Sequence, residues 1–253
     1  MAGPIGSSQW SYSVAAGGFY GHQIEQSARF DADSTSSSAS RLTKTFSTVD
    51  SNTDFTVNFW IKRAGTGAEG SNPNGSTRPH TFFTPRSGTS GTTLHEFAFM
   101  AKGSYGQGDA LVTTNTNTGA YVLSSAGEFR DTTGWYNIHM QYDLNNGTAS
   151  EKVKYFVNGT ELAYNTDNRS SFSSFSGIAA GAWTIGDYYN YGYNINAYIA
   201  QWAYVDGYTL AATVFGESKN GVWIPKDPSG LTFGNNGFHL KFQNASALGD
   251  DSS

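Results

Sequence analysis

Apolar side chains alternate with polar ones in several short runs of this chain, and that period of two constrains the fold more than any other feature. The same alternation recurs in 136–142, 153–157 and 238–242. It is clearest in 54–62, where one side of an extended chain would carry four apolar residues: Phe55, Val57, Phe59 and Ile61. Because successive side chains of a β-strand point to opposite faces of a sheet, each run predicts a half-buried strand.

Turn signals separate these runs. Asn158-Gly159 directly follows one of them and is a strong signal for a two-residue hairpin. The chain has 253 residues, of which 30 are glycine and 15% are aromatic, and this composition favours short strands joined by turns. Only residues 209–218 are weakly helical in pattern, with Gly216 as the expected stop. We therefore expect an all-β jelly-roll sandwich of two antiparallel sheets over residues 27–253, preceded by an arm over residues 1–26.

Charge and composition exclude several classes of function. The net charge is −5 and 14% of the residues are charged, without the basic patch of a nucleic-acid-binding protein. Cysteine is absent, so neither a disulfide framework nor a thiolate metal site can form. The first ten residues lack the basic and apolar regions of a signal peptide, and no run approaches the roughly 20 apolar residues of a membrane span. These features predict a soluble protein that is made and folded in a cytoplasm.

The stretch 185–207 holds six tyrosines and one tryptophan, and it divides into two parts. Residues 195–205 are apolar on both faces of an extended chain, which predicts a strand that is covered on both sides. Strict alternation places Trp202 on the same face as Tyr198, and Ile199 on the opposite face. The aromatic residues of this second part are therefore expected to be structural.

The first part, 187–194, carries Asp, Asn and Gly among its tyrosines and predicts a loop. Exposed tyrosines offer flat apolar faces and hydroxyl groups, which suit a sugar or a partner chain. The alternative is that two or more of the four tyrosines fold back onto the edge of the sandwich. The expected contact residues for a glycan or a partner are Asp187, Tyr188, Tyr189, Asn190, Tyr191, Tyr193 and Asn194.

The arm over residues 1–26 is rich in Gly, Ser and Ala, with isolated aromatic anchors at Trp10, Tyr12, Phe19 and Tyr20. Arms of this composition commonly become ordered only when they dock. We expect this one to dock on a neighbouring subunit. The alternative is a terminus that packs on its own domain.

Five segments follow one another in a characteristic order. They are "FTVNFWIKR" (55–63), "GWYNIHMQYD" (134–143), "VKYFVNGTEL" (153–162), "YIAQWAYVDGYTLAATVFGE" (198–217) and "GFHLKF" (237–242). In this order they resemble the concanavalin A-like lectin/glucanase superfamily, in its laminin-G-like jelly-roll branch. Within that branch the chain looks most like the versions found in bacteriophage virion proteins. The resemblance implies a jelly-roll sandwich and a role in a virion.

Glucanase members of this superfamily hydrolyse glycosides with paired carboxylates on one strand, spaced Glu-x-Asp-x-x-Glu. No glutamate of this chain stands in that spacing. The nearest pair, Glu128 and Asp131, would point to opposite faces and is better explained as a solvated loop before Gly134. The histidines show no metal-ligand spacing, and His139 and His239 are expected on the outer faces of strands. We therefore expect no enzymatic activity.

Calcium is the one cofactor that the resemblance raises, because such relatives bind it through loop carboxylates and carbonyls. Four aspartates occupy expected strand ends, but no D-x-D-x-D loop is present, and ordinary turn capping explains each of them: Asp131, Asp143, Asp187 and Asp206. No catalytic residue, metal ligand or cofactor is therefore assigned, and calcium stays open.

Together these features predict a non-catalytic structural protein of a bacteriophage virion, in a fibre, tail or capsid appendage. It would assemble with other virion proteins as a homo-oligomer or in many copies, attach to host-surface polysaccharide, and be made in the host bacterial cytoplasm. It would neither bind nucleic acid nor insert into a membrane. A glycan-degrading depolymerase of the same fold and a free carbohydrate-binding module remain alternatives. Two facing carboxylates would indicate the enzyme, and a concave aromatic groove or a metal would indicate the sugar binder.

Overall fold

The computed structural model describes residues 19–31, 40–46, 50–51, 53–66, 79–85, 95–102, 108–115, 120–173, 182–188 and 194–253. Within these ranges the helical elements are three short 3-10 turns, Ala149–Glu151, Arg169–Ser171 and Ala212–Val214. None of the helices in the described ranges has the length and apolar character needed to cross a bilayer. The weakly helical pattern over 209–218 corresponds to the last turn, and a strand rather than a longer helix follows it at Gly216.

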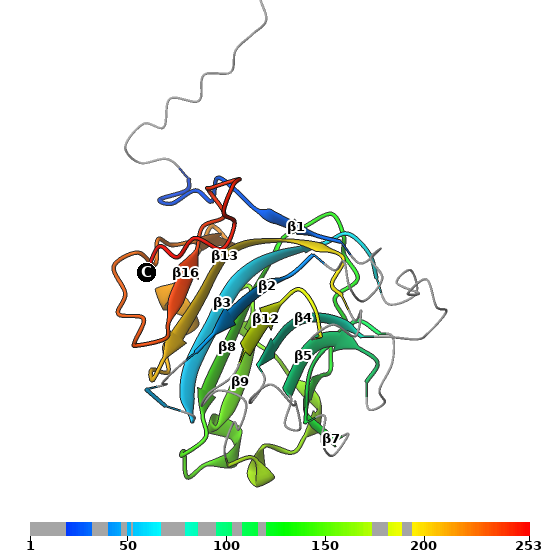
Figure 1. Cartoon of the computed structure of the whole chain (residues 1–253). Helices are drawn as coiled ribbons and strands as arrows, with labels where there is room; N and C mark the ends of the chain where they lie inside the picture. Colours follow the sequence, from blue (N-terminus) through cyan, green and yellow to red (C-terminus); the bar gives the residue numbers. More distant parts are fainter. Residues whose placement is uncertain are drawn as a thin grey trace, which may run out of the picture.

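Two seven-stranded antiparallel sheets form the body of the molecule, packed face to face (Figure 1). Sheet I contains, in spatial order, β1 (Ala28–Phe30), β13 (Ala197–Asp206), β3 (Asp54–Arg63), β8 (Tyr136–Asp143), β9 (Val153–Val157) and β10 (Thr160–Glu161), with β16 (Phe238–Leu240) beside β13. Sheet II contains β11 (Tyr164–Asp167), β7 (Ala120–Ser125), β6 (Ala110–Asn115), β5 (His95–Met100), β4 (His80–Pro85), β12 (Ala182–Ile185) and β2 (Leu42–Thr45). The predicted all-β sandwich of two antiparallel sheets is confirmed.

The core lies between the two sheets and is largely aromatic. Alternation in β3 holds as predicted, because Phe55 and Phe59 are fully buried and point toward sheet II. The ring of Phe59 stacks on Trp202 with centroids 4.3 Å apart, and Phe83 of sheet II lies 5.5 Å from the same indole. Burial of each such ring contributes about 1.5–3 kcal/mol to the stability of the fold.

Strand β13 departs from strict alternation at Gln201. This residue has a φ of 49°, and the pairing with β3 shifts register between Ala200 and Ala203. The bulge adds one residue to the strand, so Ile199 and Trp202 both point into the core. The prediction that Trp202 shares a face with Tyr198 is therefore wrong, because it assumed an unbroken period of two.

The outer face of sheet I carries a second layer formed by residues 207–236. This layer includes the antiparallel hairpin of β14 (Gly216–Lys219) and β15 (Val222–Pro225). Phe215 and Phe233 pack on Ala203 in a separate apolar cluster. The expectation that β13 is covered on both sides is thus confirmed at Ala203 and Val205, but it is wrong at Tyr198, which is 39% exposed. The layer also buries His139, and His239 is buried as well, although both point to the outer face as predicted.

Candidate functional site

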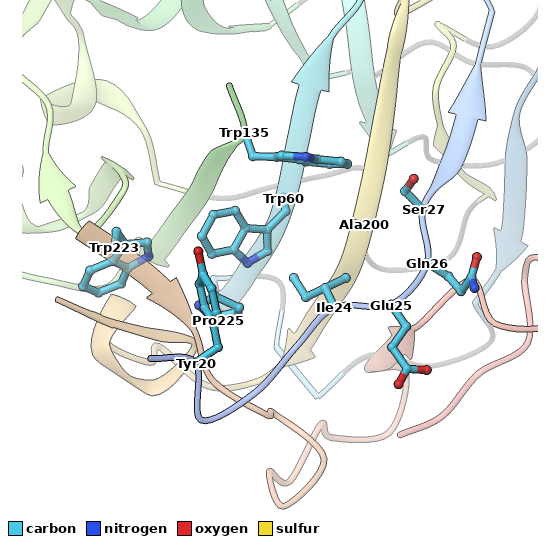
Figure 2. A pocket seen from close by; sticks show the side chains of 10 residues that line it. All are labelled: Tyr20, Ile24, Glu25, Gln26, Ser27, Trp60, Trp135, Ala200, Trp223 and Pro225. Atoms are coloured by element: carbon cyan, nitrogen blue, oxygen red, sulfur yellow. The ribbon is translucent and has the colours of Figure 1, made fainter. Parts of the chain in front are cut away.

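The second layer leaves a hollow above Trp60, on the outer face of sheet I. This hollow is a pocket of about 430 Å³, shown in Figure 2. Four aromatic side chains surround it, contributed by four separate segments: Tyr20, Trp60, Trp135 and Trp223. Ile24, Pro225 and Ala200 add apolar wall, while Glu25, Gln26 and Ser27 supply the polar groups.

Trp60 forms the floor of the pocket. It stands on the otherwise polar face of β3, so its indole projects away from the core, and it is 8% exposed. Its Nε1 is buried and has no hydrogen-bond partner. In Figure 2 the nitrogen edge of this ring is directed toward Pro225 and Ile24.

Trp223 forms one wall and is held by both packing and a hydrogen bond. Its Nε1 donates to Asn137 Oδ1 over 3.1 Å. Its ring lies against the turn after β9, where a Cβ on Gly159 would stand 2.3 Å from Cζ3 of the indole. Gly159 has a φ of +75°, so the predicted Asn-Gly hairpin is present and also makes room for the tryptophan.

A buried polar network fixes Asn137 beneath Trp223. The side-chain amides of Asn58 and Asn137 exchange hydrogen bonds of 3.2 and 3.1 Å. His139 Nε2 donates to the carbonyl of Leu210 over 3.0 Å, which leaves Nδ1 to accept from Asn58 Nδ2 at 3.3 Å. Burial lowers the pKa of His139 to about 3, so the ring is neutral and this pattern is stable near neutral pH.

The remaining walls are more exposed. Trp135 is 39% exposed and stands directly before β8. Residues 19–27, which we call the N-terminal strap, close the opposite side, with Tyr20 47% exposed. Phe19 packs edge-on against Tyr20 with centroids 4.9 Å apart, and the Lys219 ammonium lies 5.6 Å from the Phe19 centroid.

The structure accounts for two of the four aromatic residues predicted in the arm. Phe19 and Tyr20 contact the protein's own domain, as the alternative interpretation held, and Tyr20 lines the pocket. Trp10 and Tyr12 lie outside the described residues. Docking on a neighbouring subunit stays a prediction.

The predicted tyrosine-rich contact loop is described only in part. Asp187, Tyr188 and Asn194 are buried rather than exposed, with at most 8% of their surface accessible. Arg41 Nη1 lies 3.3 Å from Asp187 Oδ2, and Asn194 bridges to Thr81 of β4. Of the four tyrosines, the structure describes only Tyr188, so the alternative, which requires at least two of them to fold back onto the sandwich, stays a prediction. The other four residues, Tyr189, Asn190, Tyr191 and Tyr193, lie outside the described residues, and the role of the loop stays a prediction.

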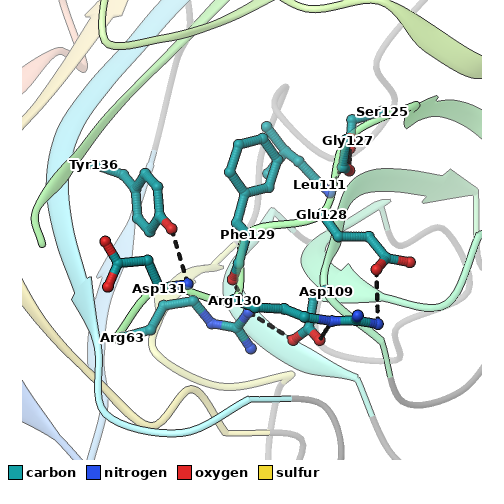
Figure 3. Close-up of polar contacts among 10 residues, drawn as sticks. All are labelled: Arg63, Asp109, Leu111, Ser125, Gly127, Glu128, Phe129, Arg130, Asp131 and Tyr136. Carbon is teal, nitrogen blue, oxygen red and sulfur yellow. Dashed lines mark hydrogen bonds and ion pairs between the residues drawn. The ribbon is translucent and has the colours of Figure 1, made fainter. Parts of the chain in front are cut away.

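Glu128, the first carboxylate of the pair before Gly134, belongs to an ion-pair network with Asp109, Arg63 and Arg130 (Figure 3). Buried Arg63 donates to Asp109 Oδ1 over 2.7 Å and to the carbonyl of Phe129. Arg130 donates to the other Asp109 oxygen over 2.9 Å and contacts Glu128 over 2.7 Å. Each carboxylate of this network is thus neutralised by a guanidinium, which is an arrangement that ties strands together.

Asp131 caps its own turn instead of facing Glu128. It accepts hydrogen bonds from the backbone and the hydroxyl of Thr133, and these bonds lower its pKa. Among the residues that the structure describes, no group of three or more His, Asp or Glu side chains could hold a metal ion.

The pocket suits stacking better than bond cleavage. Aromatic faces pack well on flat ligands with apolar C–H surfaces, and the polar groups at the rim can orient hydroxyls. Glycoside hydrolysis requires two carboxyl groups on either side of the bond. Among the described residues that line this pocket, Glu25 supplies the one carboxylate.

No protein-family model matches this chain, and no curated protein matches it either. Its structure is similar to that of a Bacteroides ovatus protein whose proposed role is carbohydrate binding. The two share 15% identity and a TM-score of 0.45 over 73% of this chain and 44% of that one. This chain therefore spans less than half the length of that relative.

Two further structures show a comparable similarity. One is the carbohydrate-binding module of a Ruminococcus gnavus sialidase bound to α2,3-sialyllactose, with 13% identity and a TM-score of 0.40 over 59% of this chain and 74% of that one. The other is the binding domain of botulinum neurotoxin serotype G, with 13% identity and a TM-score of 0.45 over 69% of this chain and 39% of that one.

Proposed function

We propose that this protein binds glycans, without cleaving them, in the aromatic pocket above Trp60. The observation that carries the proposal is the convergence of three tryptophans and one tyrosine on one open hollow, from four segments distant in the sequence. A concave aromatic groove is the feature expected of a sugar binder. Scattered surface aromatics need no explanation, but a cluster around a hollow of this size marks a ligand site.

Binding without hydrolysis follows from the carboxylates of the site. In Figure 2 the carboxylate of Glu25 is directed away from the tryptophans, so a sugar stacked there would have no acid and base on its two sides. A depolymerase would need a second carboxyl group opposite the first. We therefore favour the binding module over the enzyme.

The sequence resemblance implies a role in a virion, which is a more specific proposal than glycan binding. A glycan-binding domain present in many copies on a particle would attach to a host surface by avidity even if each site binds weakly. Location in a virion, partner proteins and copy number are expectations from the sequence. None of them rests on the pocket.

The experiment is a glycan array probed with the wild-type protein and with Trp135→Ala. Trp135 is partly exposed, so truncation removes a stacking face and leaves the core intact. We expect the variant to bind about tenfold more weakly, as the loss of one aromatic contact with its buried area predicts. The matched control is Tyr208→Ala, which removes an aromatic residue that is 47% exposed and does not line the pocket. Binding to no array glycan, or equal binding by wild type and Trp135→Ala, would refute the proposal.

A further inference from the structure

The aromatic pocket continues into two further hollows along the N-terminal strap. The second hollow has a volume of about 300 Å³ and shares four of its lining residues with the first: Tyr20, Ile24, Glu25 and Pro225. A third, of about 30 Å³, shares four residues with the second: His22, Gln23, Ile24 and Glu25. Because consecutive hollows share these residues, they adjoin one another in a row.

Strand positions show the width of this row. Trp60 lies on β3 and Ala200 on the neighbouring β13, while the third hollow reaches His239 on β16, the next strand along. Trp135 precedes β8, on the other side of β3. With neighbouring strands about 4.8 Å apart, the row crosses three spacings, roughly 14 Å. That width is greater than a single sugar ring.

The far end of the row is polar and contains buried groups without partners. Neither Nδ1 nor Nε2 of His239 has a hydrogen-bond partner, and the same is true of Gln201 Oε1. Both side chains are at least nine-tenths buried and line the third hollow. Buried polar atoms are nearly always hydrogen-bonded in folded proteins, so these point to a small polar group that occupies the recess.

A hydroxyl group matches this recess in size and in chemistry. The recess, of about 30 Å³, has room for one small polar group, because a cavity needs roughly 10–15 Å³ to hold a water molecule. Burial lowers the pKa of His239 to about 4, so the imidazole is neutral and offers one donor and one acceptor, while Gln201 adds a second acceptor. Glu25, whose carboxylate points away from the tryptophans in Figure 2, lines this end as well.

We infer that the site is built for an oligosaccharide of at least two units. One unit stacks in the tryptophan pocket, and the next runs along the strap and places a hydroxyl in the recess beside His239. This inference rests on the proposed glycan binding and deepens it, because it assigns chains rather than single terminal sugars as the ligand. Tyr20 and Pro225 lie between the two subsites and contact both units.

The test is the dependence of affinity on chain length. Isothermal titration would use oligomers of one to six units in three series, β-linked glucose, β-linked mannose and β-linked N-acetylglucosamine, extended to the backbones that the array identifies. If the site holds a single sugar unit, a longer chain gains affinity only because it offers more units that can bind there. This statistical gain is at most sixfold for the hexamer. We expect a rise of more than tenfold between one and three units, and then a plateau.

Variants at the two ends separate this inference from the proposed function. His22→Ala with Gln243→Ala removes the rim of the recess without touching the tryptophans, and Glu217→Ala on the hairpin is the exposed control. We expect the double variant to bind the trimer at least fivefold more weakly and the single sugar unchanged. Trp135→Ala should weaken the binding of both the trimer and the single sugar. Equal affinity for single sugars and trimers would overturn the inference while the glycan site stands, and a failure to bind any glycan would overturn both.

Discussion

Acid should unfold this protein through its buried histidines, and His139 provides the sharpest case. Burial lowers the pKa of His139 to about 3, from an ordinary value of 6.5. The folded state therefore binds fewer protons than the unfolded state between these two pH values. It follows that the stabilising contribution is complete above pH 6.5 and is lost as the pH falls through this window.

The magnitude follows from the two pKa values. At pH 5, His139 is almost fully protonated in the unfolded state and almost fully neutral in the folded state. This difference lowers the free energy of unfolding by about 2 kcal/mol relative to pH 8. Three further histidines are buried with a pKa lowered to about 4 by desolvation, namely His80, His95 and His239. Each of them adds to the loss of stability between pH 6.5 and the folded-state pKa in the same direction as His139.

The assay is urea denaturation of the wild type and of His139→Gln at pH 8 and at pH 5. The variant is expected to be less stable at pH 8, because it disturbs the hydrogen bonds to Asn58 and Leu210. Its loss of unfolding free energy between the two pH values should nevertheless be about 2 kcal/mol smaller than in the wild type. The control is Ile138→Val, which removes a buried methylene next to His139 for about 1 kcal/mol and leaves the pH dependence unchanged. If His139→Gln keeps the full pH dependence of the wild type, the linkage argument is refuted.

Two further predictions concern the turn beside the pocket and the ion-pair network. Gly159→Ala should lower the stability by about 2–3 kcal/mol in thermal or urea unfolding, because the new Cβ strains a positive φ and overlaps the ring of Trp223. Gly221→Ala has a similar φ of +79° but open space around it, so it should cost only the strain, and equal losses in the two variants would contradict the role of the overlap. Arg63→Met should cost about 3 kcal/mol, because it leaves a buried carboxylate without its buried partner. Arg130→Gln, at a side chain that is 67% exposed, should cost much less stability than Arg63→Met, and a reversed order of these two losses would count against the assignment.

Much of the fold could be predicted from local patterns. The runs at 55–61, 136–142 and 153–157 are strands β3, β8 and β9, because a half-buried strand shows its two faces directly in its sequence. The existence of strand β13 could be predicted from the sequence, but not which of its side chains point to each face of the sheet. The bulge at Gln201 depends on a left-handed residue for which glutamine gives no signal, and a single inserted residue reverses the faces of everything after it.

The pocket could not be predicted in the same way, because its walls come from segments that meet only in the folded molecule. One signal was present in the sequence: Trp60 stands among Thr56, Asn58 and Lys62, on a face that alternation marks as polar. A large apolar ring in such a row indicates a covered face or a ligand. The tyrosines of 187–194 were a more conspicuous pattern, but the described one, Tyr188, is buried.

The second layer connects the acid sensitivity of the fold to the site. Asn58, Asn137 and His139 occupy positions that alternation assigns to an outer polar face, and the layer of residues 207–236 covers them. Neutral His139 joins that layer to sheet I through Leu210, and through Asn58 and Asn137 it holds the hydrogen bond that orients Trp223. Protonation of His139 would place an N–H donor on Nδ1, opposite the donating amide of Asn58, and would break this hydrogen bond. Both the second layer and the Trp223 wall of the pocket depend on this contact. The pocket is therefore expected to be lost together with the second layer, and its working range lies above the pH at which these histidines become charged.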